Sequence, residues 1–375
     1  MADERVAFRP RYSTDESSNE AYAEDLRLQR FQRRKRKVYA VVILVIGCIA
    51  VTVIFRMYNF MTDITGGTVV GDSKQKSVAK KDSFGLFDDI PNNIWKQKKA
   101  ASKKAVKLQS KMIEKTSNML LESGANIDEQ RWWEQNWLPN FSCDNQQLIG
   151  GKWICAPSRI IDLADEYNNM KGRYRKVRKQ RGRRECLIYV SGGNDMEFGH
   201  QFSTFSEARM AELHTNEPGV DLSVCEIHIF NHFIDPTLLS NTATQPVHGI
   251  HVHPFGFRPE NKESMGVASD GTAFKTIKET VKELGHAGKS LSILAIDCEG
   301  CEWDMYREVL SSDFTVQEVL IQMHGTPFIA NRFFVAMHNA GYAIFHREEV
   351  GSSVYDYSFL KLAPSYFGST KPMHQ

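Results

Sequence analysis

Short apolar runs alternate with amphipathic segments over the carboxyl-terminal half of the chain. The apolar runs predict strands, and the segments with apolar residues three or four positions apart predict helices. We expect strands at 186–190, 224–230, 247–252, 291–296 and 317–323, and helices at 204–214, 272–284, 303–310 and 328–339. Two further strands, 341–346 and 355–362, have no helix between them. This order predicts an α/β fold, a doubly wound, mostly parallel sheet with an antiparallel edge hairpin.

The run 291–296 is apolar at nearly every position, which is typical of a parallel strand buried on both faces. It ends in Asp297, Cys298, Glu299 and Gly300. In open α/β sheets, ligands bind beyond the carboxyl ends of the strands, so Asp297 and Glu299 are predicted near a ligand. The alternative is that these acids complement the dipole of the helix that follows.

Other polar residues are predicted at the same edge of the sheet. The turn Ser191, Gly192, Gly193, Asn194 and Asp195 follows the first strand, where glycines let the backbone approach a nucleotide-like ligand. The pattern is not GxGxxG, so no dinucleotide fingerprint is present. His324 ends the strand 317–323, and a histidine there can act as a general base.

Near the amino terminus, the pattern changes to one continuous uncharged run from Val38 to Phe55. As a helix it would be about 27 Å long at 1.5 Å per residue, just enough to cross a bilayer. Five basic residues occupy 33–37, directly before it. The positive-inside rule therefore predicts a single-pass anchor with a cytoplasmic amino terminus. A buried core helix preceded by a nuclear localisation signal is the alternative.

These patterns divide the chain into five segments. Residues 1–37 form a disordered basic tail on the cytoplasmic side, and 38–58 form the transmembrane signal anchor. Residues 59–130 are a lumenal linker and a lysine-rich stem helix, and 131–184 are a module rich in aromatic residues and cysteine. Its tryptophans are expected in a core rather than on a carbohydrate-binding surface. Residues 185–375 are the main domain.

The cysteines fit an oxidising compartment. Of seven, six follow the predicted anchor, and we expect the pairs Cys143–Cys155 and Cys186–Cys225, with free buried thiols as the alternative. Asn140 begins a glycosylation sequon. These features place the domain in the lumen of the endoplasmic reticulum or Golgi, or outside the cell.

Charge and histidine content exclude some roles and leave others open. The net charge of +2 does not favour nucleic acid as a partner. His251 and His253 would share one face of a strand and His248 the other, so no metal site is predicted there. A divalent metal at the acidic pair remains possible. Cys298 and Cys301 form C-x-x-C without a thioredoxin-like context, so no redox role is expected, and Cys298 should point into the sheet.

Several motifs occur in an order that resembles a known family. They are GGKWIC at 150–155, CLIYVSGGN from 186, CEIHIFN from 225, SILAIDCEGCEW, LIQMHG and AGYAIFHRE. In this order they are similar to the FkbM-related group of S-adenosylmethionine-dependent methyltransferases, which includes methyltransferase-like protein 24. The resemblance implies a Rossmann-like class I methyltransferase fold with the cofactor across the carboxyl ends of the first strands. The acceptor would approach near the fourth and fifth strands.

The resemblance also implies roles for residues. Ser191 and the turn Gly192 to Asn194 would hold the methionine part of the cofactor. Asn231 stands where the family has an acid for the ribose, so that role could shift to Asp235. Two more positions depart from the family: 198–201 read FGHQ rather than an aromatic followed by glutamate, and Gln322 replaces an acid.

We therefore expect a membrane-anchored enzyme that moves a methyl group from S-adenosylmethionine to an oxygen of a sugar or another small hydroxylated acceptor. Asp297, Glu299 and His324 are its candidate catalytic residues. A type II Golgi glycosyltransferase with Asp297 and Glu299 as metal ligands is one alternative. A binding module that has the fold but little turnover is the other, and the oligomeric state is not predicted.

Overall fold

The computed structural model describes most of the chain beyond residue 81. The described ranges are 82–123, 129–169, 185–192, 195–215, 222–234, 249–260, 273–311, 314–325 and 327–367. All belong to one compact unit that spans Lys76–Gln375. The predicted tail and anchor lie outside them. Within the described ranges, no helix is both long and apolar enough to cross a membrane.

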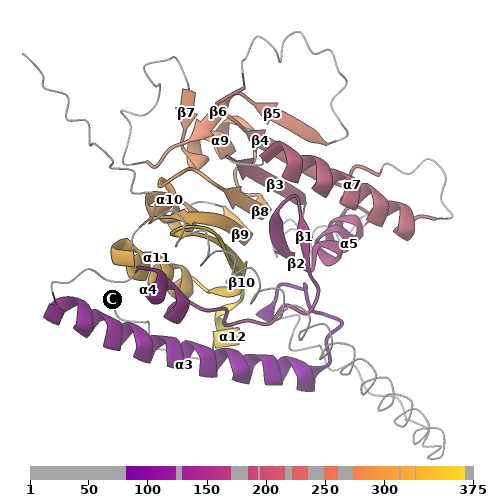
Figure 1. Ribbon diagram of the computed structural model, residues 1–375. Helices are drawn as coiled ribbons and strands as arrows, with labels where there is room; N and C mark the ends of the chain where they lie inside the picture. The colour runs from indigo at the N-terminus through magenta and orange to yellow at the C-terminus, as the bar shows by residue number, and fades with distance from the viewer. Residues whose placement is uncertain are drawn as a thin grey trace, which may run out of the picture. The chain divides into compact units, whose positions relative to one another are not determined.

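A seven-stranded sheet forms the centre of the unit, in the order β10-β11-β9-β8-β3-β4-β5 (Figure 1). The five strands from β9 to β5 are parallel, and β10 and β11 form an antiparallel hairpin at one edge. The bounds are β3 Cys186–Ser191, β4 Cys225–Phe230, β5 Ile250–His253, β8 Ser290–Ile296, β9 Thr315–His324, β10 Tyr342–Gly351 and β11 Val354–Lys361. The sheet is Rossmann-like, as the alternation of strands and helices predicted.

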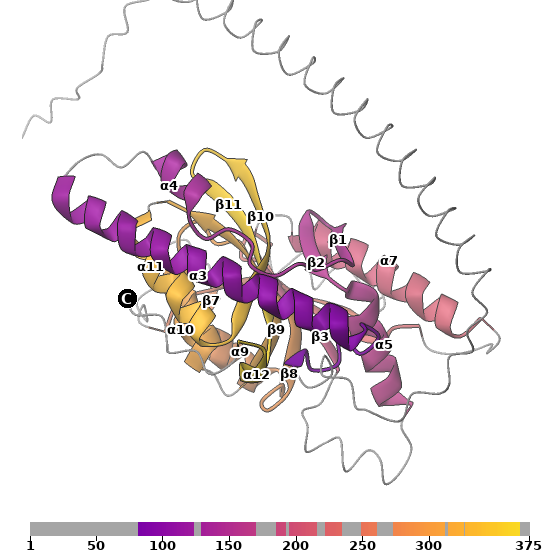
Figure 2. The same cartoon turned by 90° about the horizontal axis from the view of Figure 1, so that it is seen from below.

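Helices cover both faces of the sheet (Figures 1 and 2). On one face, α5 (Pro157–Asn168) and α7 (Asp195–Leu213) pack over Ile188 and Val190 of β3. On the other, α9 (Ile277–Glu283), α10 (Glu302–Ser311) and α11 (Pro327–Asn339) pack over Leu187 and Tyr189. Successive side chains of a strand point to opposite faces of the sheet. Because helices cover both faces, most positions of these strands are buried, and the strands are apolar without alternation.

Two predicted helix boundaries were wrong. The helix expected over 272–284 begins at Ile277, because 273–275 forms a short strand, β7 (Ala273–Lys275), parallel to β6 (Phe255–Phe257). Thr276 caps α9: its side chain accepts a hydrogen bond from the Glu279 amide, and Glu279 accepts one from the Thr276 amide. The helix expected from 204 begins earlier, at Asp195. The capping box and the acid at the start of α7 were the signals for both boundaries.

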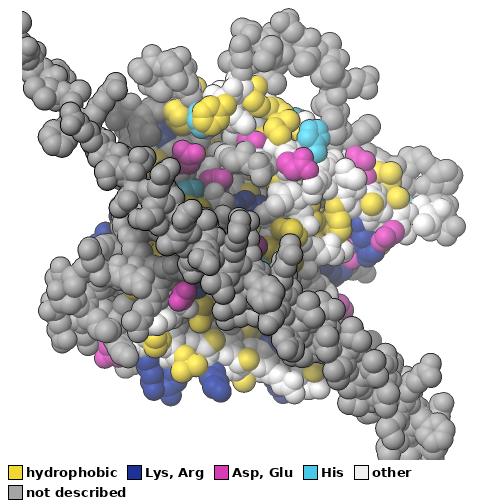
Figure 3. Space-filling view, in the orientation of Figure 1, with side chains coloured by type: hydrophobic (Ala, Val, Ile, Leu, Met, Phe, Trp, Pro, Cys, Tyr) yellow, Lys and Arg dark blue, Asp and Glu magenta, His cyan; other side chains and the backbone are white. Residues whose placement is uncertain are grey.

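The lysine-rich segment forms a helix, α3 (Asn92–Ser123), that lies against the rest of the unit (Figure 2). Trp95 is fully buried, and its indole N–H donates to Asp82. Lys98 donates to Asp144 at 2.7 Å. Other lysines on this helix are exposed and form a basic stripe along the lower side of the molecule in Figure 3: Lys96, Lys103, Lys104, Lys107 and Lys111.

The tryptophan-rich module belongs to the core, as expected. Trp132, Trp133 and Trp137 are each at most 3% exposed. Trp133, on α4 (Glu129–Gln135), stacks on Tyr355 of β11 with 5.0 Å between ring centroids. Burial of large aromatic rings attaches this module firmly to the hairpin edge of the sheet.

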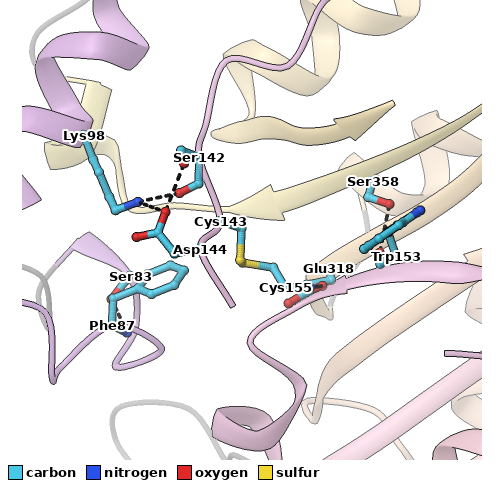
Figure 4. The surroundings of a disulfide bond; sticks show 10 residues. All are labelled: Ser83, Phe87, Lys98, Ser142, Cys143, Asp144, Trp153, Cys155, Glu318 and Ser358. Atoms are coloured by element: carbon cyan, nitrogen blue, oxygen red, sulfur yellow. Dashed lines mark hydrogen bonds and ion pairs between the residues drawn. A yellow bond between two sulfur atoms is a disulfide. The ribbon is translucent and has the colours of Figure 1, made fainter. Parts of the chain in front are cut away.

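Both predicted disulfides, Cys143–Cys155 and Cys186–Cys225, are present. The first joins the end of β2 (Lys152–Cys155), which pairs with β1 (Gln146–Ile149), to the preceding loop (Figure 4). The Cys155 amide donates to Glu318 of β9 at 3.0 Å. Glu318 is fully buried, and burial raises the pKa of its carboxyl well above the usual value.

Candidate active site at the carboxyl ends of the strands

The turn after β3 and the acid after β8 lie in direct contact. The Asp297 amide donates to the Ser191 carbonyl at 2.8 Å. Gly192 has a positive φ of 87°, and a Cβ atom added there would lie 1.5 Å from the Asp297 carbonyl oxygen. Only glycine fits this position. The structure thus brings together two groups that the sequence predicted at one edge, while Gly193 and Asn194 lie outside the described residues.

Asp195 is a buried acid at the start of α7, directly after the turn, and is 2% exposed. Its Oδ1 accepts hydrogen bonds from the Met196 amide at 2.6 Å and from the Asn231 side chain at 3.2 Å. Its Oδ2 is buried and has no hydrogen-bond partner among the described residues. Burial raises the pKa of this carboxyl. Asn231, predicted to bind the ribose, therefore lies beside the acid Asp195. Asp235, the predicted substitute for Asn231, lies outside the described residues.

Sequence reasoning gave Asp195 no role of its own, although an acid directly after a glycine turn was the available signal. The Asn231 side-chain oxygen is already engaged, because it accepts from the Phe233 amide at 2.9 Å. Among the described residues, Asp195 Oδ2 is a buried oxygen at this edge without a hydrogen-bond partner.

Burial also raises the pKa of Asp297, whose side chain is 16% exposed, while nearby Lys152 and His324 oppose that shift. Lys152 extends from β2, and its Nζ lies 2.8 Å from Asp356 Oδ1. The Gln322 amide donates to the same oxygen at 3.0 Å. Asp356 of β11 is the register partner of Gln322 of β9. The carboxylate that is missing at position 322 is therefore supplied by the neighbouring strand.

The turn between β1 and β2 is packed closely against α7. A Cβ atom at Gly150 would lie 2.2 Å from the Phe198 Cα, and the Gly150 amide donates to Gln201 at 2.8 Å. A Cβ atom at Gly199 would lie 2.6 Å from Ile229. The FGHQ segment that departs from the family pattern thus supplies packing contacts that position the hairpin carrying Lys152.

His324 is held by a buried glutamate that the sequence analysis did not single out. Glu302 has no exposed side-chain area, and its Oε1 accepts from the His324 amide at 2.6 Å and from His324 Nδ1 at 3.0 Å. Because a carboxylate only accepts, Nδ1 carries a proton and Nε2 of the neutral ring is free of one. His324 Nε2 lies 3.8 Å from Asp297 Oδ1. The Trp303 indole also donates to the His324 carbonyl.

Glu299 does not join this group. It is exposed, its φ is +50°, and no ion pair or hydrogen bond within the described part of the chain connects it to Asp297 or His324. A third disulfide, Cys298–Cys301, closes the loop that contains it. This pair was not among the predicted disulfides, and both cysteines are partly buried against the core on one face of the sheet. The loop is tied to Glu302, whose Oε2 accepts from the Gly300 amide at 2.7 Å.

The surface between these groups is only slightly hollowed. A cavity of about 20 Å³, enough for roughly one water molecule, lies between the hairpin turn and the strand ends. Its polar lining includes Lys152, Ser191, Asp195 and Asp297. We call this surface at the carboxyl ends of the strands the rim.

Comparison with known protein families gives one finding. The model of a family described as a methyltransferase domain matches residues 77–361, which is more than half of the chain and includes every rim residue named above. No curated protein matches the chain significantly.

Proposed function

The chain belongs to this methyltransferase domain family, and from that premise we propose that it transfers a methyl group from S-adenosylmethionine to an oxygen of a sugar or another small hydroxylated acceptor. The finer likeness, to the FkbM-related and methyltransferase-like protein 24 group, rests on the motifs from Gly150 to Glu348. Methyl transfer depends on alignment of donor and acceptor, so it needs no covalent intermediate on the protein.

The rim has features that suit this methyl donor. The close contact of Gly192 with the Asp297 backbone holds the turn after β3 directly beside the end of β8. Asp195 Oδ2, which has no hydrogen-bond partner among the described residues, can accept a hydrogen bond from the ligand's ammonium or hydroxyl groups. We propose that Ser191, Gly192 and Asp195 hold the donor, together with Gly193, Asn194 and Asn231. When bound, the donor supplies an activated methyl group on a positively charged sulfur.

The residues on the other side of Asp297 suit a hydroxyl acceptor. Glu302 keeps the proton of His324 on Nδ1, so Nε2 can remove the hydroxyl proton as the acceptor oxygen is methylated. Asp297 lies close enough to orient the same hydroxyl. Asp356 and Lys152 provide a charged pair at the edge of this space. Glu299, exposed on the disulfide loop, has no role in this proposal.

The observation that carries the proposal is the contact between Gly192 and Asp297, because it puts a donor site beside candidate catalytic groups. Calorimetric titration of the full chain with S-adenosylmethionine and with S-adenosylhomocysteine tests it. We expect saturable binding of both at one site per chain. No heat and no thermal shift at millimolar ligand would contradict the proposal.

The alternatives make different predictions. A glycosyltransferase needs Asp297 and Glu299 to share a metal, but Glu299 is exposed and apart from the other rim groups in the described structure. It would bind a nucleotide sugar with a divalent metal instead of the methyl donor. A binding module would bind the donor yet produce no S-adenosylhomocysteine with any hydroxylated acceptor.

We propose further that the enzyme is a single-pass type II membrane protein with its catalytic domain in the lumen of the endoplasmic reticulum or Golgi, or outside the cell. The uncharged run 38–55 and the three disulfides support this arrangement. A glycan at Asn140 that an endoglycosidase removes is the expected result. An unmodified Asn140, together with an amino terminus protected from protease in sealed vesicles, would show the opposite orientation.

A further inference from the structure

A cluster of histidines lies apart from the rim, on the face of β4 and β5 that α9 covers. His228 of β4 is the parallel register partner of His251 of β5. His228 is 4% exposed, whereas His251 is exposed at the edge of the sheet. Glu226 precedes His228 by two positions and so lies on the same face of β4.

Hydrogen bonds connect the side chains of this cluster. Glu226 Oε1 accepts from His228 Nε2 at 3.0 Å and from His286 Nε2 at 3.1 Å. His228 Nδ1 lies 2.9 Å from His253 Nε2.

We propose that Glu226, His228 and His251 form a binding site for a divalent transition metal, of which Zn²⁺ is the representative. Each residue offers one ligand atom, and these atoms lie within 4.8 Å of one another. Ligands at about 2.0–2.1 Å from a tetrahedral zinc are roughly 3.3 Å apart. The 3.0 Å distance from Glu226 Oε1 to His228 Nε2 already approaches that value.

The surroundings supply the supporting contacts that metal ligands need. With Nε2 on the metal, His228 carries its proton on Nδ1 and donates it to His253 Nε2, which fixes the ring. His286 continues to donate to the Glu226 carboxylate and is itself held by the Tyr189 hydroxyl at 2.6 Å. Lys289 lies 3.7 Å from the other oxygen, Oε2, so Oε1 would accept from His286 and also bind the metal.

The His251 ring must rotate before all three residues can bind one metal ion. The rings of His228 and His251 are nearly parallel, with 16° between their planes and 4.8 Å between centroids. A metal cannot lie in both ring planes in this arrangement. His251 is exposed, so its ring can rotate without disturbing the core. Two imidazoles and one carboxylate leave a fourth position for water or another ligand, as in zinc sites that are open to solvent.

Calorimetric titration of the metal-free full chain with Zn²⁺ tests the site, in buffer without reductant so that Cys298 and Cys301 stay joined. We expect one saturable site per chain. His251→Asn and Glu226→Gln should each weaken Zn²⁺ binding at least ten-fold. His200→Asn, an exposed histidine on α7, is the matched control and should bind Zn²⁺ as the unaltered chain does.

The His251→Asn variant keeps the test decisive, since an exposed side chain can be changed without unfolding the core. Co²⁺ should give the visible absorption of a four-coordinate site in the unaltered chain and lose it in this variant. The proposal is wrong if the unaltered chain takes up no saturable Zn²⁺, or if His251→Asn binds it as tightly. Binding of S-adenosylmethionine, measured on the same variant, should not change, so the result is independent of the proposed function.

Discussion

The two edges of the parallel sheet, at the carboxyl and the amino ends of its strands, have different chemistry. At the carboxyl ends of β3 and β8, Asp195 and Asp297 have raised pKa values because burial is not balanced by partners. Toward the amino end of β4, Glu226 has a lowered pKa because His228 and His286 donate to it. Asp195 and Asp297 are thus short of partners, whereas Glu226 accepts two hydrogen bonds. Perturbed, poorly paired acids are typical of functional sites, so the comparison favours the carboxyl edge as the reactive one.

The largest predicted difference between the two ends concerns their disulfides. Cys186–Cys225 joins β3 and β4 at the amino end and spans 39 residues, whereas Cys298–Cys301 spans three at the rim. Loop-closure entropy predicts that changing both cysteines to serine lowers the free energy of unfolding by about 4 kcal/mol for the first pair and about 2 kcal/mol for the second.

Urea denaturation measures both values, and Cys143→Ser with Cys155→Ser, a span of 12, should fall between them. The variant without Cys298–Cys301 should also have lower catalytic turnover, which its loss of stability does not explain. The Cys298–Cys301 loop bonds to Glu302, which holds His324, so opening it should reduce turnover while the donor still binds. Equal loss of stability from the two pairs, with turnover intact at the rim, would contradict the division of roles.

The next effect is at Gly192. Alanine there would place Cβ 1.5 Å from the Asp297 carbonyl oxygen, so the turn must move away from the acid. We expect S-adenosylmethionine to bind at least 100-fold more weakly, about 2.7 kcal/mol, measured by calorimetry. Gly288→Ala is the matched control, because Gly288 also has a positive φ but nothing lies within 4 Å of its added Cβ. Equal affinities in the two variants would remove Gly192 from the donor site.

Sequence reasoning predicted contacts that follow from strand direction. Because parallel strands end at one edge, Gly192 and Asp297 could be placed together although about a hundred residues separate them. The cysteine pair Cys186–Cys225 follows from the same logic, since both residues begin neighbouring strands.

The missed residues depend on side-chain geometry rather than on strand order. Glu302 was part of the SILAIDCEGCEW motif without a role of its own, and only the fold shows that its carboxylate reaches His324. Lys152 comes from a hairpin whose position is set by the contact of Gly150 with Phe198, which no periodicity reveals. The strand at 273–275 was hidden because three residues carry too little pattern to separate them from the helix that follows.

A smaller effect should appear at Asp195. A carboxyl with a raised pKa stabilises the fold only below its unfolded pKa, and this contribution is lost as the pH rises through the folded value. Asp195→Asn keeps an oxygen for the Met196 amide and removes the charge. We expect unfolding at pH 7 to require about 1 kcal/mol more in the variant, with the gain vanishing near pH 4. S-adenosylmethionine should bind more weakly to this variant. If the variant is less stable than the unaltered chain and binds S-adenosylmethionine as tightly, Asp195 is neither a strained acid nor a ligand of the donor.

The smallest effect, of opposite sign, should appear at Glu226. A lowered pKa means that this carboxylate stabilises the fold above its unfolded pKa, and that the contribution is lost as the pH falls through the folded value. The side chain is 39% exposed, so solvent screening limits the effect of Glu226→Gln to less than about 1 kcal/mol of destabilisation at pH 7. Parallel urea titrations at pH 4 and pH 7 should show the stability difference shrinking toward acid for Glu226→Gln. If the destabilisation caused by Glu226→Gln instead grows as the pH falls, the Glu226 carboxylate is no better paired than the acids at the rim.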